Sequence, residues 1–178
     1  MRLVAVGVTL TQPLVVTKDP RVSTPEADLA RQFELARDVQ TERVRVAKSL
    51  RQAEALRKQI SALRGRATAG AASAIDAFAA AVAVAAGPPL TGGPEDFFGE
   101  SEAAPTSLRR LSTSLARFQQ TVESADAAPT TDALEGFRRR RNAVAQGLGR
   151  WQELLGSDLA RANAALKSEG LPPLEPEQ

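Results

Sequence analysis

Apolar residues recur every three or four positions along two long stretches of this chain, residues 29–63 and 134–166. A repeat of about 3.5 residues keeps one apolar stripe facing a neighbouring helix in a left-handed coiled coil. The first expected stripe consists of Leu29, Phe33, Ala36, Val44, Ala47, Leu50, Ala53, Leu56, Ile60 and Leu63. The second consists of Leu134, Phe137, Arg141, Val144, Leu148, Trp151, Leu155, Leu159, Ala162 and Leu166. The pattern therefore predicts two long amphipathic helices.

Capping residues place the ends of these two helices. Thr24 is the expected N-cap of the first helix, and Gly65 is expected to end it, since glycine adopts the left-handed conformation common after a helix. The last helix is expected to begin at Thr130 or Thr131 and to end at Gly170. Each helix is then about 40 residues and about 60 Å long.

Two shorter helices lie between the long ones. The first covers residues 67–86, with an expected stripe of Ala71, Ile75, Phe78, Val82 and Ala85. The second follows Pro105, with an expected stripe of Leu108, Leu111, Leu115, Phe118 and Val122. The 67–86 segment has one charged residue, Asp76, which would cost about 2.5–3.5 kcal/mol at the centre of a membrane. An alanine-lined helix of a bundle is therefore favoured over a membrane span, and no membrane span is predicted.

The helix lengths predict a mainly α fold, an elongated antiparallel bundle of long helices. The two shorter helices together match one long helix that the insertion loop 87–104 interrupts. Three long layers with a broken middle layer are favoured over a four-helix bundle with a two-helix stalk. The predicted divisions are a β-strand segment at 1–22, the helical bundle at 23–170 and a C-terminal tail at 171–178.

The first 17 residues read as two short strands rather than as a signal peptide. Their apolar run is short, no small-residue cleavage site follows it, and β-branched Val and Thr favour strands. Val6-Gly7 is the expected turn of a hairpin, and Pro13 marks an edge position. Because an isolated hairpin is marginally stable in water, it is expected either to pack on the helices or to join another sheet.

The composition excludes several kinds of chemistry. The chain has no Cys, no His and no Tyr, which rules out Cys- or His-based zinc sites, Ser-His-Asp and Cys-His triads and the Glu-x-x-His di-iron pattern. The candidate carboxylates lie on the first helix, largely off its apolar stripe: Glu26, Asp28, Glu34, Asp38 and Glu42. Some carboxylates precede a cation by four residues, as Glu54 precedes Lys58, which is typical of solvated surface pairs. We therefore expect no catalytic residue, no metal and no cofactor.

Arginine is the residue type with the clearest functional alternative. The candidate patch for nucleic acid or another anionic partner consists of Arg138, Arg139, Arg140, Arg43, Arg51 and Arg57. No aromatic platform or base-reading motif accompanies these residues, and arginine stems also cover thin, alanine-rich cores. A solvated helix face is the favoured interpretation, and nucleic-acid binding is the alternative.

Three further features have a structural and a functional interpretation. Phe97 and Phe98 in the 87–104 loop are either part of a tolerated insertion or the anchors of a docking loop. Gly147-Leu148-Gly149 lacks the strand and the Lys-Ser/Thr of a phosphate loop, so it predicts a flexible or closely packed point in the last helix. Trp151 lies on the stripe and is expected in the core rather than in a ligand platform.

Several segments together resemble a known family, the large bacterial sortilin-like proteins with BNR-repeat propellers. They are Thr11–Val16, Asp19–Val22, Ala27–Leu29, Ser124–Thr130, Arg150–Trp151 and Leu166–Leu174. The resemblance covers nearly the whole chain and matches the C-terminal helical region of these proteins, which follows a β-sandwich module. Such a hairpin usually has Asp-Gly or Asn-Gly at its turn, so Val6-Gly7 leaves the register of the first strand open.

The resemblance implies a role and a location. The family is often labelled glycosyl hydrolase, but that label belongs to the propeller, so no site residue is carried over to this chain. The expected function is a non-catalytic structural or interaction module of an exported, periplasmic or cell-surface protein, whose partners are protein domains or a second copy. A free-standing bundle that binds an anionic partner through its Arg-rich faces is the alternative.

Overall fold

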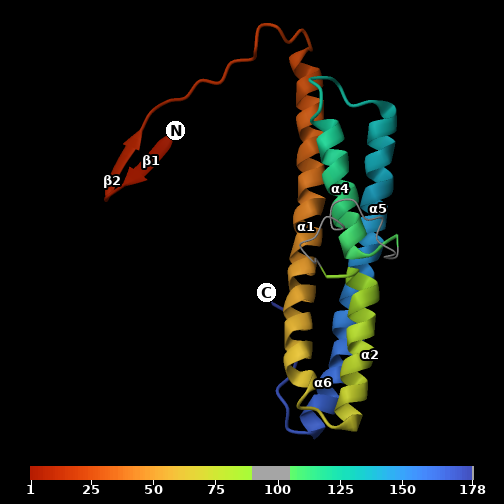
Figure 1. Ribbon diagram of the computed structural model, residues 1–178. Helices are drawn as coiled ribbons and strands as arrows, with labels where there is room; N and C mark the ends of the chain where they lie inside the picture. The colour runs from red at the N-terminus through yellow and green to blue at the C-terminus, as the bar shows by residue number, and fades with distance from the viewer. Residues whose placement is uncertain (90–104, 178) are drawn as a thin grey trace.

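A computed structural model describes residues 1–89 and 105–177 of the chain (Figure 1). The chain begins with two strands, β1 (Arg2–Ala5) and β2 (Val8–Thr11). The helices are α1 (Glu26–Arg64), α2 (Ala69–Ala86), α4 (Leu108–Val122), α5 (Thr131–Glu153) and α6 (Leu159–Ser168), with a π-helical segment η1 (Leu154–Asp158) between α5 and α6. The fold is mainly helical, as the sequence predicts.

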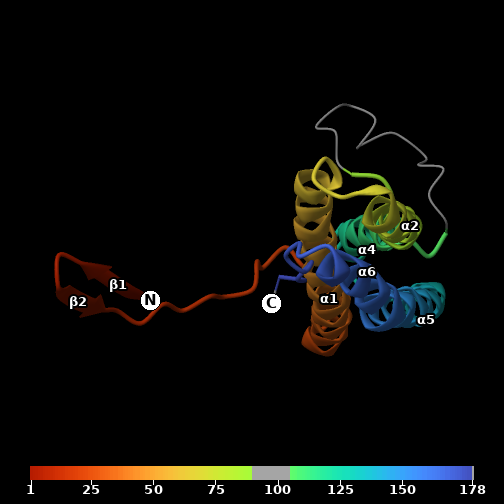
Figure 2. The same ribbon diagram turned by 90° about the horizontal axis from the view of Figure 1, so that it is seen from below.

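The helices form three long antiparallel layers, and the middle layer is broken. Helix α1 runs the full length of the bundle, α2 and α4 follow one another in the opposite direction, and α5, η1 and α6 return as one continuous rod (Figures 1 and 2). Helix α1 packs on both α2 and α4, while α4 packs on α5 and α2 packs on α6. This arrangement confirms the three-layer alternative.

The buried stripe of α1 differs from the predicted one in its first half. Its members alternate in steps of four and three: Leu35, Val39, Glu42, Val46, Ser49, Ala53, Leu56, Ile60 and Leu63. Phe33 and Val44, which were expected on the stripe, are 66% and 55% exposed. The apolar pattern was misleading because polar Glu42 occupies a stripe position, where its carboxylate pairs with Arg45 at 2.8 Å.

The π-helical segment shifts the stripe of the third layer by one residue. The buried positions step from Trp151 and Leu154 to Leu159 across five residues instead of four, because a π-helix closes its hydrogen bonds over one extra residue. The predicted stripe omits the buried Leu154 and includes Leu134, which is 53% exposed, whereas Leu159, Ala162 and Leu166 are buried as expected. Trp151 is fully buried, as predicted, and its Nε1 donates to Gln52 Oε1 at 3.1 Å.

Gly147 is the closely packed point that the sequence predicted in the last helix. A Cβ atom at this position would lie 2.5 Å from Cδ1 of Leu111 and 2.8 Å from the carbonyl oxygen of Thr106. A Cβ atom at Gly149 would meet nothing within 4 Å. The start of α4 can therefore approach α5 only because residue 147 has no side chain.

The helix ends follow the predicted caps in part. Thr130 caps α5 by accepting the Ala133 N–H at 3.1 Å, as expected. Thr24 does not cap α1, whose N-cap is Pro25; instead its hydroxyl donates to the carbonyl of Asp126 and ties the start of α1 to the α4–α5 loop. Glu169, which follows α6, accepts the Thr68 and Ala71 N–H groups at 2.8 and 3.0 Å, so the third layer caps α2.

The N-terminal strands form the expected antiparallel hairpin with Val6-Gly7 as its turn. Their register pairs Ala5 with Val8 and Arg2 with Thr11. Val6 and Gly7 have φ angles of 49° and 76°, as in the mirror-image turns that suit two-residue hairpins. The hairpin extends away from the helices, and all of its residues are exposed (Figure 1).

Candidate functional site

Some of the arginines of the patch predicted for an anionic partner form hydrogen bonds within the bundle. Arg43 donates to Gln119 Oε1 on α4 at 2.7 Å. Arg57 pairs with Glu54 at 2.6 Å and also donates to the carbonyl of Gly87, at the end of α2. These guanidinium groups connect α1 to the two halves of the middle layer.

Arg140 also has a structural environment. Its guanidinium lies 4.5 Å from the ring centre of Phe118, and its Nε donates to Ser114 Oγ at 3.2 Å. Phe118 in turn stacks on Phe137, with ring centres 6.2 Å apart. Arg140 therefore covers the aromatic contact between α4 and α5, as arginine stems and planes commonly do.

The remaining arginines of the patch are exposed. Arg139 pairs with Glu135 at 3.6 Å on the surface of α5. Arg51 on α1 and Arg138 on α5 make no ion pair with any residue that the structure describes. Phe97 and Phe98, the predicted docking residues, lie outside the described residues.

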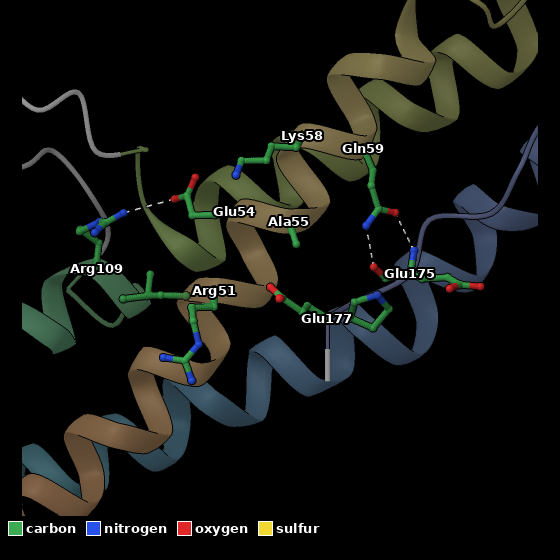
Figure 3. Close-up of a pocket in the computed structure, with 10 residues that line it drawn as sticks. Arg51, Glu54, Ala55, Lys58, Gln59, Arg109, Glu175 and Glu177 are labelled. Atoms are coloured by element: carbon green, nitrogen blue, oxygen red, sulfur yellow. Dashed lines mark hydrogen bonds and ion pairs between the residues drawn. The ribbon is translucent and has the colours of Figure 1, made fainter. Parts of the chain in front are cut away.

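A groove of about 790 Å³ lies beside α1 (Figure 3). It is lined by Leu50, Arg51, Glu54, Ala55, Lys58, Gln59, Arg109, Glu175, Pro176 and Glu177. Glu54 lies within 3.3 Å of Arg109, which brings the start of α4 to the groove. Cations and carboxylates thus share one concave surface between α1, α4 and the segment after α6.

The segment after α6 is attached to the groove by amide side chains. The Gln59 amide donates to the carbonyl of Glu175 at 2.8 Å and accepts its N–H at 2.9 Å (Figure 3). The Asn163 amide does the same for Leu174, at 3.0 and 2.8 Å. Leu174 is 1% exposed and belongs to the core, so the described part of the predicted tail, residues 171–177, is anchored to the bundle.

The sequence does not predict this groove. Its two sides are far apart in the sequence, with Gln59 and Glu175 separated by 116 residues. A glutamine and an asparagine on helix faces read as ordinary surface residues. The only signal in the sequence is Leu174, a single large apolar residue among the prolines and glutamates of Pro172–Glu177.

The carboxylate of Glu169 has a lowered pKa and a structural role. Hydrogen bonds from Thr68, its hydroxyl first and its backbone N–H second, hold the pKa of Glu169 below its usual value of 4.5. A carboxylate at a helix N-terminus is favoured by the free N–H groups and the positive end of the helix dipole. Glu169 therefore connects the end of α6 to the start of α2.

Comparisons with protein-family models, curated proteins and solved structures find no match for this chain. Within residues 1–89 and 105–177, no group of three acidic residues is placed to hold a metal ion. None of the described helices is long and apolar enough to cross a membrane.

Proposed function

We propose that this chain is a non-catalytic structural and interaction module, in which a helical rod presents the N-terminal hairpin to a β-sheet partner. The observation that supports this proposal is the uncovered apolar face of the hairpin. Three layers that bury a continuous core give the rod its stiffness, and segment 12–25 joins the hairpin to α1.

The register of the hairpin separates its two faces. In an antiparallel pair, directly opposite residues point to the same side and successive residues alternate. One face therefore carries Leu3, Ala5, Val8 and Leu10, and the other carries Arg2, Val4, Thr9 and Thr11. The first face is entirely apolar, and Leu3, Val8 and Leu10 are 56%, 58% and 63% exposed. Such a face is typical of a strand pair that packs on another sheet.

Main-chain groups add a second means of association. Each strand of the hairpin pairs only with the other among the described residues, so its outer edge is free for strand addition. The apolar character continues after the hairpin, where Leu14, Val15 and Val16 are each more than 60% exposed in an extended segment. A β-rich partner would cover both features at once.

The family resemblance indicates the kind of partner. It implies a β-sandwich module next to the hairpin and a propeller in the same exported protein, with the helical rod bracing them. We propose this arrangement as the biological setting. The groove beside α1 lies on the rod and is not needed for it.

The test uses paired charge substitutions on the two faces of the hairpin. If the DNA upstream of the Met1 codon encodes a β-sandwich, that domain is produced separately and mixed with the full chain. Leu3→Lys with Leu10→Lys is expected to weaken binding more than 100-fold, because each buried leucine contributes about 1.5–3 kcal/mol. Binding is measured by isothermal titration calorimetry.

Val4→Lys with Thr9→Lys is the matched control, since it adds the same charges in a cross-strand pair on the opposite face. This variant is expected to bind like the unmodified chain. The proposal fails if the upstream DNA encodes no β domain, if that domain does not bind, or if both double variants lose binding equally.

A further inference from the structure

The groove beside α1 has the features of a peptide-binding site that is already occupied. We propose that it binds an extended acidic peptide with a leucine anchor, and that Leu174–Glu177 of this chain are its resident ligand. A peptide of the same chemistry from another protein would then compete with this segment. The proposal does not depend on the role of the hairpin.

Backbone recognition is the first observation that supports it. Asn163 and Gln59 each use both ends of one amide to satisfy the N–H and the carbonyl of a single residue, Leu174 and Glu175 respectively. Gln52 adds a bond to the carbonyl of Glu177 at 3.0 Å. These hydrogen bonds recognise the backbone of an extended segment, as a neighbouring strand does in strand addition.

The orientation of the recognising amides is fixed. Gln52 accepts the Nε1–H of the buried Trp151 at 3.1 Å, which leaves its amide nitrogen to donate to the peptide segment. Each of the other two amides is held by its pair of bonds to one residue. The site is therefore built by α1 and α6 together, and its alignment depends on the core.

The leucine pocket supplies selectivity for one side chain. Leu174 is 1% exposed and packs within the core cluster, whereas the glutamates that follow it line the open groove. A site that recognises the main chain and buries one apolar side chain fits a short linear motif. The anchor must be apolar, because burying a charged side chain in the core is costly.

Charge complementarity indicates that the residues after the anchor are acidic. Arg51 and Lys58 line the groove and are exposed, without an ion pair to any residue that the structure describes. Glu175 and Glu177 line the same groove, and the Glu177 carboxylate points toward α1 on the side of Arg51, so the segment brings negative charge to a surface that carries unpaired cations (Figure 3). Long-range attraction of this kind favours acidic peptides.

The link to α6 allows the segment to leave without unfolding a helix. Gly170, with φ of 67°, ends the helical turn, and Pro172-Pro173 connect it to Leu174. Prolines keep this connection extended and prevent it from joining a helix. Release of residues 174–177 would therefore expose the leucine pocket and the amides while α1 and α6 remain formed.

The experiment measures peptide binding to the full chain by fluorescence polarisation. The probe is a fluorescein-labelled peptide with the sequence of residues 171–177. Leu174→Asp, which expels the resident segment, is expected to bind it with a micromolar Kd. The unmodified chain is expected to bind about 100-fold more weakly, because a short tether gives the resident segment a millimolar effective concentration. Circular dichroism checks that the variant is helical.

Two controls test the recognising groups. Adding Gln59→Glu and Asn163→Asp to Leu174→Asp removes the amide donors without changing side-chain size and is expected to weaken binding at least tenfold. A probe with aspartate in place of the leucine should not bind. A folded Leu174→Asp chain that does not bind the probe at about 1 mM, well above a micromolar Kd, would overturn the proposal.

A second variant covers the case in which Leu174→Asp does not fold. Glu175→Pro removes the N–H that Gln59 accepts, and residue 175 is exposed, so the core is left unchanged. This chain should bind the probe more tightly than the unmodified chain does. Equal binding by the two chains would contradict a groove held by its own segment.

Discussion

Gly147→Ala is expected to lower the free energy of unfolding by about 1–3 kcal/mol, the usual cost of overpacking a core. The new methyl group would approach the carbonyl oxygen of Thr106 to 2.8 Å, and a backbone atom cannot move aside as a side chain can. Relieving the contact requires the start of α4 to move away from α5. The packing of α4 on α5 would then weaken, while α2 would still pack on α6.

Gly149→Ala is the matched control for this substitution. Both glycines lie in α5, but a methyl group at residue 149 meets nothing within 4 Å. Alanine is favoured over glycine in a helix interior, so Gly149→Ala should raise the free energy of unfolding by up to about 1 kcal/mol. Urea denaturation of the two variants measures the difference. If both glycines respond alike, the close approach of α4 to α5 is wrong.

Deleting Gly156 is expected to leave the chain folded with little loss of stability. Gly156 is exposed and lies in the π-helical segment, where the stripe takes a five-residue step from Leu154 to Leu159. Removing one residue turns this step into the four-residue step of a regular α-helix, so Leu159 and the stripe after it stay on the buried face.

Deletion of Gln146, eight residues before the start of the π-helical segment, has a different expected result. Removing the exposed Gln146 rotates the residues after it by about 100° around the helix, as 3.6 residues per turn requires. Trp151 would leave the core, at a cost of about 3–5 kcal/mol, the range for losing a large aromatic side chain. Thermal unfolding followed by circular dichroism compares the two deletions. Equal losses would show that the π-helical segment does not set the register of the third layer.

The helix ends and the number of layers could be predicted because each depends on local chemistry. Gly65 and Gly87 directly follow the last residues of α1 and α2, and Thr130 caps α5 through its own hydroxyl. The lengths that follow from these ends predicted three layers. The phase of the α1 stripe could not be predicted, because the tertiary structure buries Glu42 while leaving Phe33 exposed.

Among the candidate sites, one could be predicted from the sequence and another could not. The hairpin turn could be predicted from Val6-Gly7, because a glycine between two strand-forming segments readily adopts the positive φ that a tight turn requires. The groove could not be predicted, because nothing in the sequence indicates that the Gln59 side chain forms hydrogen bonds with the main chain of Glu175, 116 residues away. The arginine content suggested, as an alternative to a solvated face, a patch for an anionic partner; packing places Arg140 over the ring of Phe118.

Hydrogen–deuterium exchange of the full chain by itself tests most directly the claim that a self-sufficient rod presents an uncovered hairpin. Amides of β1 and β2 are expected to exchange nearly as fast as open chain, whereas those of the buried stripes should be protected about 1,000-fold or more. The stripes include Val39 to Leu63 of α1 and Val144 to Leu166 of the third layer. Hairpin amides that are as well protected as the stripes in the monomer would show that the hairpin packs on the helices and would contradict the account.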